Sequence, residues 1–149
     1  MSQPCFANKT SADWLNQHQS KPVVVDENAS IDQIINALLI EHRRDAYVVN
    51  ADNKVIGHIG FANVATHLLS EHRVTHTHRQ LFARVIEPTA KELMDPHFTS
   101  AYEDELLCDV IHRQLDHGLD DLIVLSRDTH VPLGAIQLKD VLAESLCLD

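Results

Sequence analysis

Most of this sequence occurs twice along the chain, so its fold has to accommodate two similar halves. The segment Ser11–Leu15 has a counterpart in Thr89–Leu93. Each begins with a hydroxyl residue of the kind that caps a helix and continues as a short helical turn. A repeat of roughly 55 residues is too small to bury a sufficient core alone. We therefore expect the two halves to pack sheet against sheet and to share one core.

Each half shows the same order of predicted elements: an extended segment, an amphipathic helix, two short strands around a polar turn, and a closing helix. In the first half these are Pro22–Asp26, the helix face Ile31, Ile34, Ile35, Leu38 and Leu39, the strands Ala46–Val49 and Val55–Ile59, and a helix from Phe61 to about His72. In the second half they are Pro96–Ser100, the face Leu107, Val110, Ile111, Gln114 and Leu115, the strands Leu122–Leu125 and Pro132–Ile136, and a helix from Leu138 to about Leu146.

The predicted fold class is α/β (α+β), with two tandem β-α-β-β-α repeats related by pseudo-twofold symmetry. Each repeat is expected to form a small sheet flanked by helices. The predicted domains are 1–72 for the first repeat with its N-terminal helical segment, 73–88 for a histidine-rich connector, and 89–149 for the second repeat.

This order of elements, with a glycine between the last strand and the last helix, resembles the CBS domain family, named after cystathionine β-synthase. The resemblance extends from about Ser11 to Leu146, and the diagnostic stretches are Val55–Asn63, Ala90–Pro96 and Gly134–Asp140. It implies a stand-alone tandem CBS pair, or Bateman module. Such a module senses a small ligand, commonly forms a homodimer, and would signal to a separate client protein.

The resemblance also implies ligand positions. In the family pattern, Thr or Ser three residues after a glycine helps to hold phosphate. Asp or Asn three residues later grips the ribose of AMP, ATP or S-adenosylmethionine. The ribose positions in this sequence are Asn63 and Asp140, and the hydroxyl positions are Gly60 and Gln137. A carboxylate can accept from both hydroxyls of a vicinal diol.

A second hypothesis is a structural interaction module whose clefts are empty or filled by side chains. Gly60 and Gln137 favour it, because neither residue supplies the hydroxyl of the family pattern. A carboxylate or amide early in a helix also stabilises free backbone N–H groups without any ligand. Asp140 and Asn63 therefore have a structural interpretation beside the functional one.

A third hypothesis is a metal-binding or pH-responsive module. His72 and His76 lie one turn apart if the helix continues, and His76 and His78 could chelate from an extended segment, so these three are the candidate metal ligands. Solvent-exposed imidazoles in a connector are the simpler interpretation. Protonation of all eleven histidines would change the formal net charge from −10 to +1.

Other classes of function are disfavoured. The net charge of −10 opposes attraction to nucleic acid or to an anionic membrane, and no apolar stretch is long enough to span a bilayer. The N-terminal residues do not resemble a secretory signal, and three widely spaced cysteines indicate a reduced cytoplasm.

We predict no catalytic residues and no enzymatic activity, because no acid, base and nucleophile can be named together. The group Glu103–Glu105 is expected to complement a helix dipole, Asp121 to be a turn residue, and Cys108 to be a buried, inert thiol.

Overall fold

The computed structural model describes residues 8–72 and 88–146, which form two compact units. Unit 2 takes its described residues from Val23–Asp52 and Ile56–His97. Unit 1 takes its described residues from Met1–Pro22, Asn53–Val55 and Phe98–Asp149. In the part of the chain that the structure describes, we find no helix with the length and apolarity that a membrane crossing requires.

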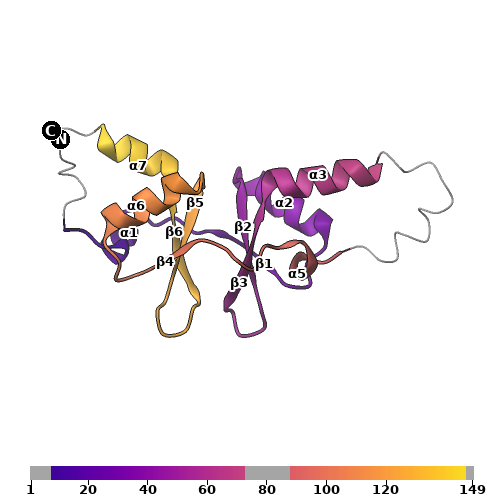
Figure 1. Cartoon of the computed structure of the whole chain (residues 1–149), viewed down its shortest axis with the longest axis horizontal. Coiled ribbons are helices and arrows are strands. Elements are labelled where there is room, and N and C mark those ends of the chain that lie inside the picture. Colours follow the sequence, from indigo (N-terminus) through magenta and orange to yellow (C-terminus); the bar gives the residue numbers. More distant parts are fainter. Residues whose placement is uncertain (1–7, 73–87, 147–149) are drawn as a thin grey trace. The chain divides into compact units, whose positions relative to one another are not determined.

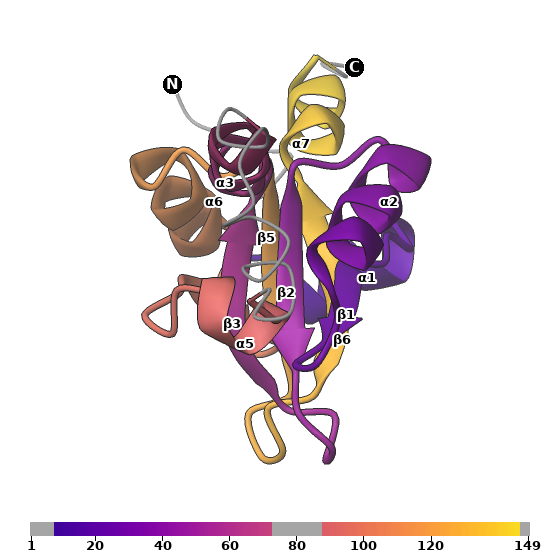
Figure 2. The same ribbon diagram turned by 90° about the vertical axis from the view of Figure 1, so that its right-hand side faces the viewer.

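Unit 2 is built on a three-stranded sheet of order β1-β2-β3, in which β1 and β2 are parallel. Its elements in chain order are β1 (Val23–Asp26), α2 (Ile31–Glu41), β2 (Asp45–Val49), β3 (Val55–Gly60), α3 (Phe61–His72) and α5 (Ala90–Leu93). The central strand β2 is buried along its whole length. Figure 2 looks onto this unit and shows α2 and α3, which contact each other, beside the sheet.

Unit 1 repeats this plan with a sheet of order β4-β5-β6, in which β4 and β5 are parallel and β5 and β6 antiparallel. Its elements are α1 (Ser11–Gln17), β4 (Ser100–Tyr102), α6 (Leu107–Asp116), β5 (Asp121–Leu125), β6 (Pro132–Gln137) and α7 (Leu138–Ser145). In each unit the longer helices lie on one side of the sheet (Figure 1). The predicted mixed fold with two small sheets flanked by helices is therefore confirmed.

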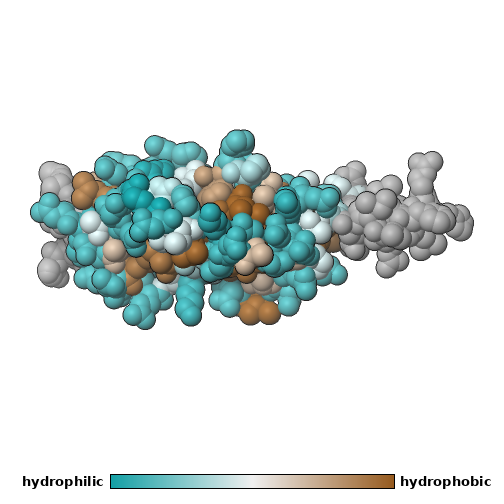
Figure 3. Space-filling model, turned by 90° about the horizontal axis from the view of Figure 1, so that it is seen from below, coloured by the Kyte–Doolittle hydropathy of each residue, from teal (hydrophilic) through white to brown (hydrophobic). Residues whose placement is uncertain are grey.

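Each unit has a hydrophobic core of its own, in which apolar helix positions face alternate strand positions. The core of unit 2 is centred on Ile31, Ile34 and Leu38 of α2 with Ala46 and Val48 of β2. The core of unit 1 contains Leu107 and Val110 of α6, Leu122 and Val124 of β5 and also Trp14, which is fully buried, whereas the polar Gln114 stands at the position of Leu38. The predicted shared core and pseudo-twofold axis stay predictions. The face drawn in Figure 3 is mostly hydrophilic, with apolar side chains gathered in small patches.

The leading helix of each repeat packs in the unit formed by the strands of the other repeat. Helix α1 contacts β6 and α6, and the backbone N–H of Ser11 donates to the Glu105 carbonyl over 2.9 Å. Helix α5 is bound in the same way in unit 2, where the Ala90 N–H donates to the Ala29 carbonyl over 2.9 Å. The predicted domains follow the sequence repeat, with boundaries 1–72, 73–88 and 89–149, and they stay a prediction. They do not coincide with the two compact units.

The structure corrects the register of the duplicated leading segment by one residue. Thr10, rather than Ser11, is the N-cap of α1, since its hydroxyl accepts from the Asp13 N–H and its own N–H donates to the Asp13 carboxylate. Thr89 caps α5, and its N–H donates to the Glu92 carboxylate over 2.8 Å. Thr10 therefore corresponds to Thr89.

The extended segment of the second repeat also differs from the prediction. The sequence pattern matches Pro22 with Pro96, but β4 begins only at Ser100. The parallel ladders explain the shift, because Val23 pairs with Ala46 in one sheet and Ser100 pairs with Ile123 in the other. Proline is found at strand starts in general, so two prolines near two strands do not fix the register.

Candidate functional site: two glycine motifs at strand–helix junctions

Both glycine motifs fold into the same local structure. In unit 2, Gly60 ends β3 and Asn63 is the third residue of α3. In unit 1, Gln137 ends β6 and Asp140 is the third residue of α7. Each motif therefore places its acid or amide in the first turn of a helix, directly after a strand end.

The first glycine of each motif is required because another segment lies on top of it. A Cβ atom added at Gly134 would stand 2.7 Å from the Leu15 Cδ2 atom, and one added at Gly57 would stand 2.6 Å from the Met94 Cγ atom. Both distances are far below ordinary van der Waals contact. Leu15 belongs to α1 and Met94 directly follows α5, so each motif glycine allows a leading segment to approach the strand.

The first amide of each closing helix is already hydrogen-bonded. Phe61 N–H donates to the Arg44 carbonyl, and Leu138 N–H donates to the Asp120 carbonyl, both over 2.8 Å. These bonds tie the start of the last helix to the loop before the central strand. They also leave fewer free N–H groups at each helix start for an incoming anion.

The motif in unit 1 is covered by polar side chains of the leading segment. The Gln137 side-chain amide donates to the Ser20 hydroxyl, and Ser20 also accepts the Ala135 N–H at its carbonyl over 2.9 Å. His18 lies 3.4 Å from the carboxylate of Glu144 on α7 and stacks on Trp14. Asp140 itself is half-buried and lies one turn before Glu144 on the same helix.

The motif in unit 2 is more open. Outside its chain neighbours, an added Cβ atom at Gly60 would meet only the His58 ring, at 3.8 Å, and Asn63 is exposed. Here the leading segment is joined through the main chain: His58 and Asp95 exchange backbone hydrogen bonds of 3.1 and 2.8 Å. The two motifs therefore have the same backbone arrangement but differ in the side chains around them.

His58 and Asp45 form a polar pair that sequence reasoning missed. The His58 Nε2 atom lies 2.8 Å from an Asp45 carboxylate oxygen, and the His58 ring lies against Tyr47. Asp45 is buried at the start of β2, and Asp121 is buried at the start of β5. The prediction that Asp121 is a turn residue is therefore wrong. A polar loop precedes each acid and suggests a turn, and nothing in the sequence reveals their burial.

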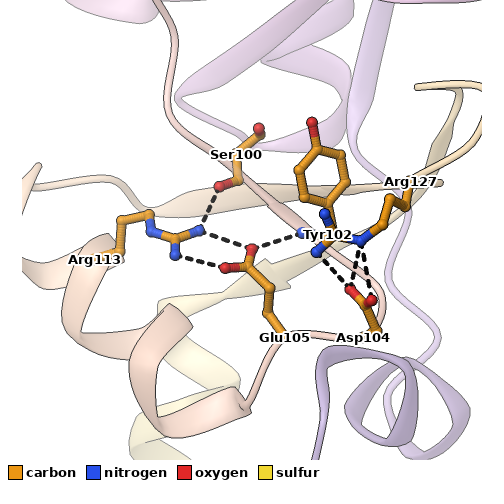
Figure 4. Close-up of polar contacts among 6 residues, drawn as sticks. All are labelled: Ser100, Tyr102, Asp104, Glu105, Arg113 and Arg127. Atoms are coloured by element: carbon orange, nitrogen blue, oxygen red, sulfur yellow. Dashed lines mark hydrogen bonds and ion pairs between the residues drawn. The ribbon is translucent and has the colours of Figure 1, made fainter.

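Two acids of the group Glu103–Glu105, Asp104 and Glu105, form salt bridges with arginines rather than a reactive site (Figure 4). Arg113 binds the Glu105 carboxylate through two nitrogens, at 3.0 and 2.7 Å, and also donates to the Ser100 carbonyl. Arg127 binds Asp104 through two nitrogens and lies over the Tyr102 ring.

Each arginine lowers the pKa of its acid. The hydrogen bond from Arg113 lowers the pKa of Glu105, and the bond from Arg127 lowers the pKa of Asp104. Arg113 lies 8 positions from Glu105 and Arg127 lies 23 positions from Asp104, and neither spacing is the three or four residues of a pair within one helix. Both carboxylates are held ionised, as a structural role requires.

Two further predictions concern single residues. Cys108 is exposed on α6 rather than buried, because it lies off the buried face that carries Leu107 and Val110. Gln114, the one polar residue on the predicted apolar face of α6, is fully buried and donates its amide to three backbone carbonyls.

The predicted histidine site lies outside what the structure describes. His76 and His78 fall outside the described residues, and His72 is described only as the backbone end of α3. Among the described residues, no group of three or more potential ligands could hold a metal ion. The metal hypothesis stays a prediction.

Comparison with known proteins identifies the class. Residues 18–70 match the family model of the CBS domain. A structure of CBSX2 in complex with AMP is 17% identical, covers 93% of this chain and 97% of its own length, and has a TM-score of 0.71. The CBS domain pair of MJ0100, in complex with 5′-methylthioadenosine and S-adenosyl-L-methionine, is 18% identical over 83% of this chain and 91% of its own, with a TM-score of 0.63.

A third similar structure is the CBS domain of a membrane protein from Sphaerobacter thermophilus, which is 19% identical, covers 99% of this chain and 93% of its own, and has a TM-score of 0.64. No curated protein matches the chain. Residues 18–70 are thus a CBS domain, and the chain as a whole has the fold of a CBS-domain pair.

Proposed function

We propose that this chain is a regulatory CBS-pair module that binds an adenosine-type ligand at its glycine motifs and signals to a partner protein. Among the solved structures with a similar fold, one holds AMP, a CBS domain pair holds S-adenosylmethionine with methylthioadenosine, and the cytosolic domain of the Mg²⁺ channel MgtE holds ATP. Such a ligand regulates only if it binds two conformations of the module unequally.

The observation that carries the proposal is the placement of Asp140. It is a half-buried carboxylate in the first turn of α7, at the junction where the leading segment crosses the strand end. A carboxylate in this place can accept hydrogen bonds from both hydroxyls of a ribose. Asn63 occupies the same place in α3 and offers one amide oxygen for the same purpose.

A ligand-free structural module is the second candidate, and one observation favours it. The Gln137 amide already donates to the Ser20 hydroxyl, so a side chain fills the position where the family pattern has a phosphate-holding hydroxyl. In that case the fold would serve only to present surfaces to another protein, and the motif residues would stabilise the junction.

The module is proposed to act as a cytoplasmic homodimer and not as an enzyme. Exposed leucines occur at matching places in both repeats: Leu39 on α2 and Leu115 on α6 are both 55% exposed. Apolar side chains repeated on two helices are suited to contact with a second copy. Light scattering that gives a single 16.8 kDa chain at all concentrations would contradict the dimer.

Thermal unfolding with AMP, ATP, adenosine and S-adenosylmethionine separates the two candidates. A ligand at a hundred times its dissociation constant should add about 2.7 kcal/mol to the free energy of unfolding. Asp140→Ala should abolish that gain. Asp109→Ala is the matched control, because Asp109 is an exposed acid at the same third position of α6.

Both variants lose a similar small helix-dipole contribution, so only a lost ligand effect distinguishes them. Unchanged melting with every ligand would defeat the sensor proposal and leave the structural module. An equal loss in both variants would show that the effect is not specific to the motif.

A further inference from the structure

The corner of unit 1 around Asp140 is poorly suited to hold phosphate. A phosphate needs hydrogen-bond donors, and two of the nearest are already engaged. The Gln137 side-chain amide donates to the Ser20 hydroxyl, and the Leu138 N–H donates to the Asp120 carbonyl over 2.8 Å. An incoming phosphate would have to break one of these bonds before it could form its own.

The charges at this corner also oppose an anion. Asp140 and Glu144 lie one turn apart on α7, and Asp120 and Asp121 lie in the segment that is bonded to the start of the same helix. The lysines next in sequence to Asp140 and to Ser20 are Lys139 and Lys21, and both are exposed. The imidazole of His18 faces Glu144 at 3.4 Å. Acidic side chains outnumber basic ones at this corner, so they repel a doubly negative phosphate. A neutral or cationic group is not repelled in this way.

We infer that the Asp140 corner selects adenosine-type ligands without a phosphate, either neutral nucleosides or cationic sulfonium derivatives, over AMP and ATP. This inference rests on the proposed function, since it concerns the ligand class of the same site. Asp140 accepts the ribose hydroxyls, and the 5′ substituent of the ligand meets Gln137 and the surrounding acids. The departure of Gln137 from the family pattern becomes a determinant of specificity.

Isothermal titration calorimetry tests the inference with adenosine as the neutral nucleoside, S-adenosylmethionine as the sulfonium derivative, and AMP and ATP, all on the full chain. Adenosine should bind the unmodified protein at least about tenfold more tightly than AMP, a difference that corresponds to roughly 1.4 kcal/mol. Gln137→Thr supplies the hydroxyl and removes the amide that bonds to Ser20. Because threonine is a good N-cap residue, this variant should fold, and it should bind AMP about tenfold more tightly with little change for adenosine.

Gln137→Ala is the matched control, because it removes the same amide without supplying a hydroxyl, and it should gain no affinity for AMP. AMP binding as tight as adenosine in the unmodified protein would overturn the inference and leave the proposed function standing. An unchanged ratio of the two affinities in Gln137→Thr would also overturn it. Failure of all four ligands to bind would overturn the inference and the proposed function together.

Discussion

Ser11 and Ala90 occupy the same position in the two leading helices and are both fully buried. Each is the first residue after the threonine cap, and each N–H donates to a carbonyl of its own unit over 2.9 Å. The Ser11 hydroxyl, however, has no hydrogen-bond partner among the described residues. A buried hydroxyl without a partner loses its hydration and gains nothing in return.

Ser11→Ala should therefore leave the protein folded and raise the free energy of unfolding by about 1 kcal/mol, the lower part of the range for an unsatisfied buried group. The reverse exchange, Ala90→Ser, should lower it by a similar amount. Denaturant unfolding of both variants measures the two changes. A loss of stability in Ser11→Ala would contradict this expectation and indicate that the hydroxyl makes a stabilising bond.

At the scale of elements, the structure departs from the sequence prediction chiefly in the leading segments. Hydrophobic periodicity places α2 and α6 correctly, because each of these helices buries one apolar face. The near-continuous apolar runs of β2 and β5 indicate strands that are buried along their whole length, and the two closing helices also lie where they are expected. Hydrophobic periodicity cannot show that α1 packs against β6, or that α5 belongs to unit 2. Short helical turns carry too few apolar positions to indicate their neighbours.

The site is predictable only in part. Repetition of the motif places Asp140 and Asn63 at equivalent helix starts, and the structure has both there. The bond between Gln137 and Ser20 joins residues 117 positions apart, and the pair of His58 and Asp45 joins two strands. Neither contact follows from local sequence, because side chains brought together by a sheet can be far apart along the chain.

The close approach at Gly134 makes a prediction about these elements. Gly134→Ala should lower the free energy of unfolding by about 1–3 kcal/mol, as overpacking does, because the new methyl group would collide with Leu15. Gly60→Ala is the control and should change little, since an added Cβ atom there meets only the His58 ring at 3.8 Å. Chemical denaturation measures both.

The double variant Gly134→Ala with Leu15→Ala tests the mechanism of that loss. The two changes should be less than additive, because the shortened side chain of residue 15 makes room for the methyl group. Full additivity would show that α1 does not pack on β6 in solution. It would also remove the steric reason for a glycine at position 134.

At the scale of the whole molecule, the two units have the same arrangement of strands and helices, but their glycine motifs are not equivalent. Unit 1 surrounds its motif with polar and acidic side chains, whereas unit 2 leaves Gly60 open and Asn63 exposed. Under the proposed function, the difference predicts that the two motifs bind different ligands, or that only one of them binds a ligand. The duplication therefore preserves the fold while the local side chains set the chemistry of each copy.

The most direct test is the amide NMR spectrum of the ¹⁵N-labelled chain during titration with adenosine. A sensor that binds at the Asp140 corner predicts progressive shifts that centre on Gly134–Asp140 and Ser20 and that vanish in Asp140→Ala. A spectrum that does not change, or one whose shifts fall on residues away from both glycine motifs, would contradict it.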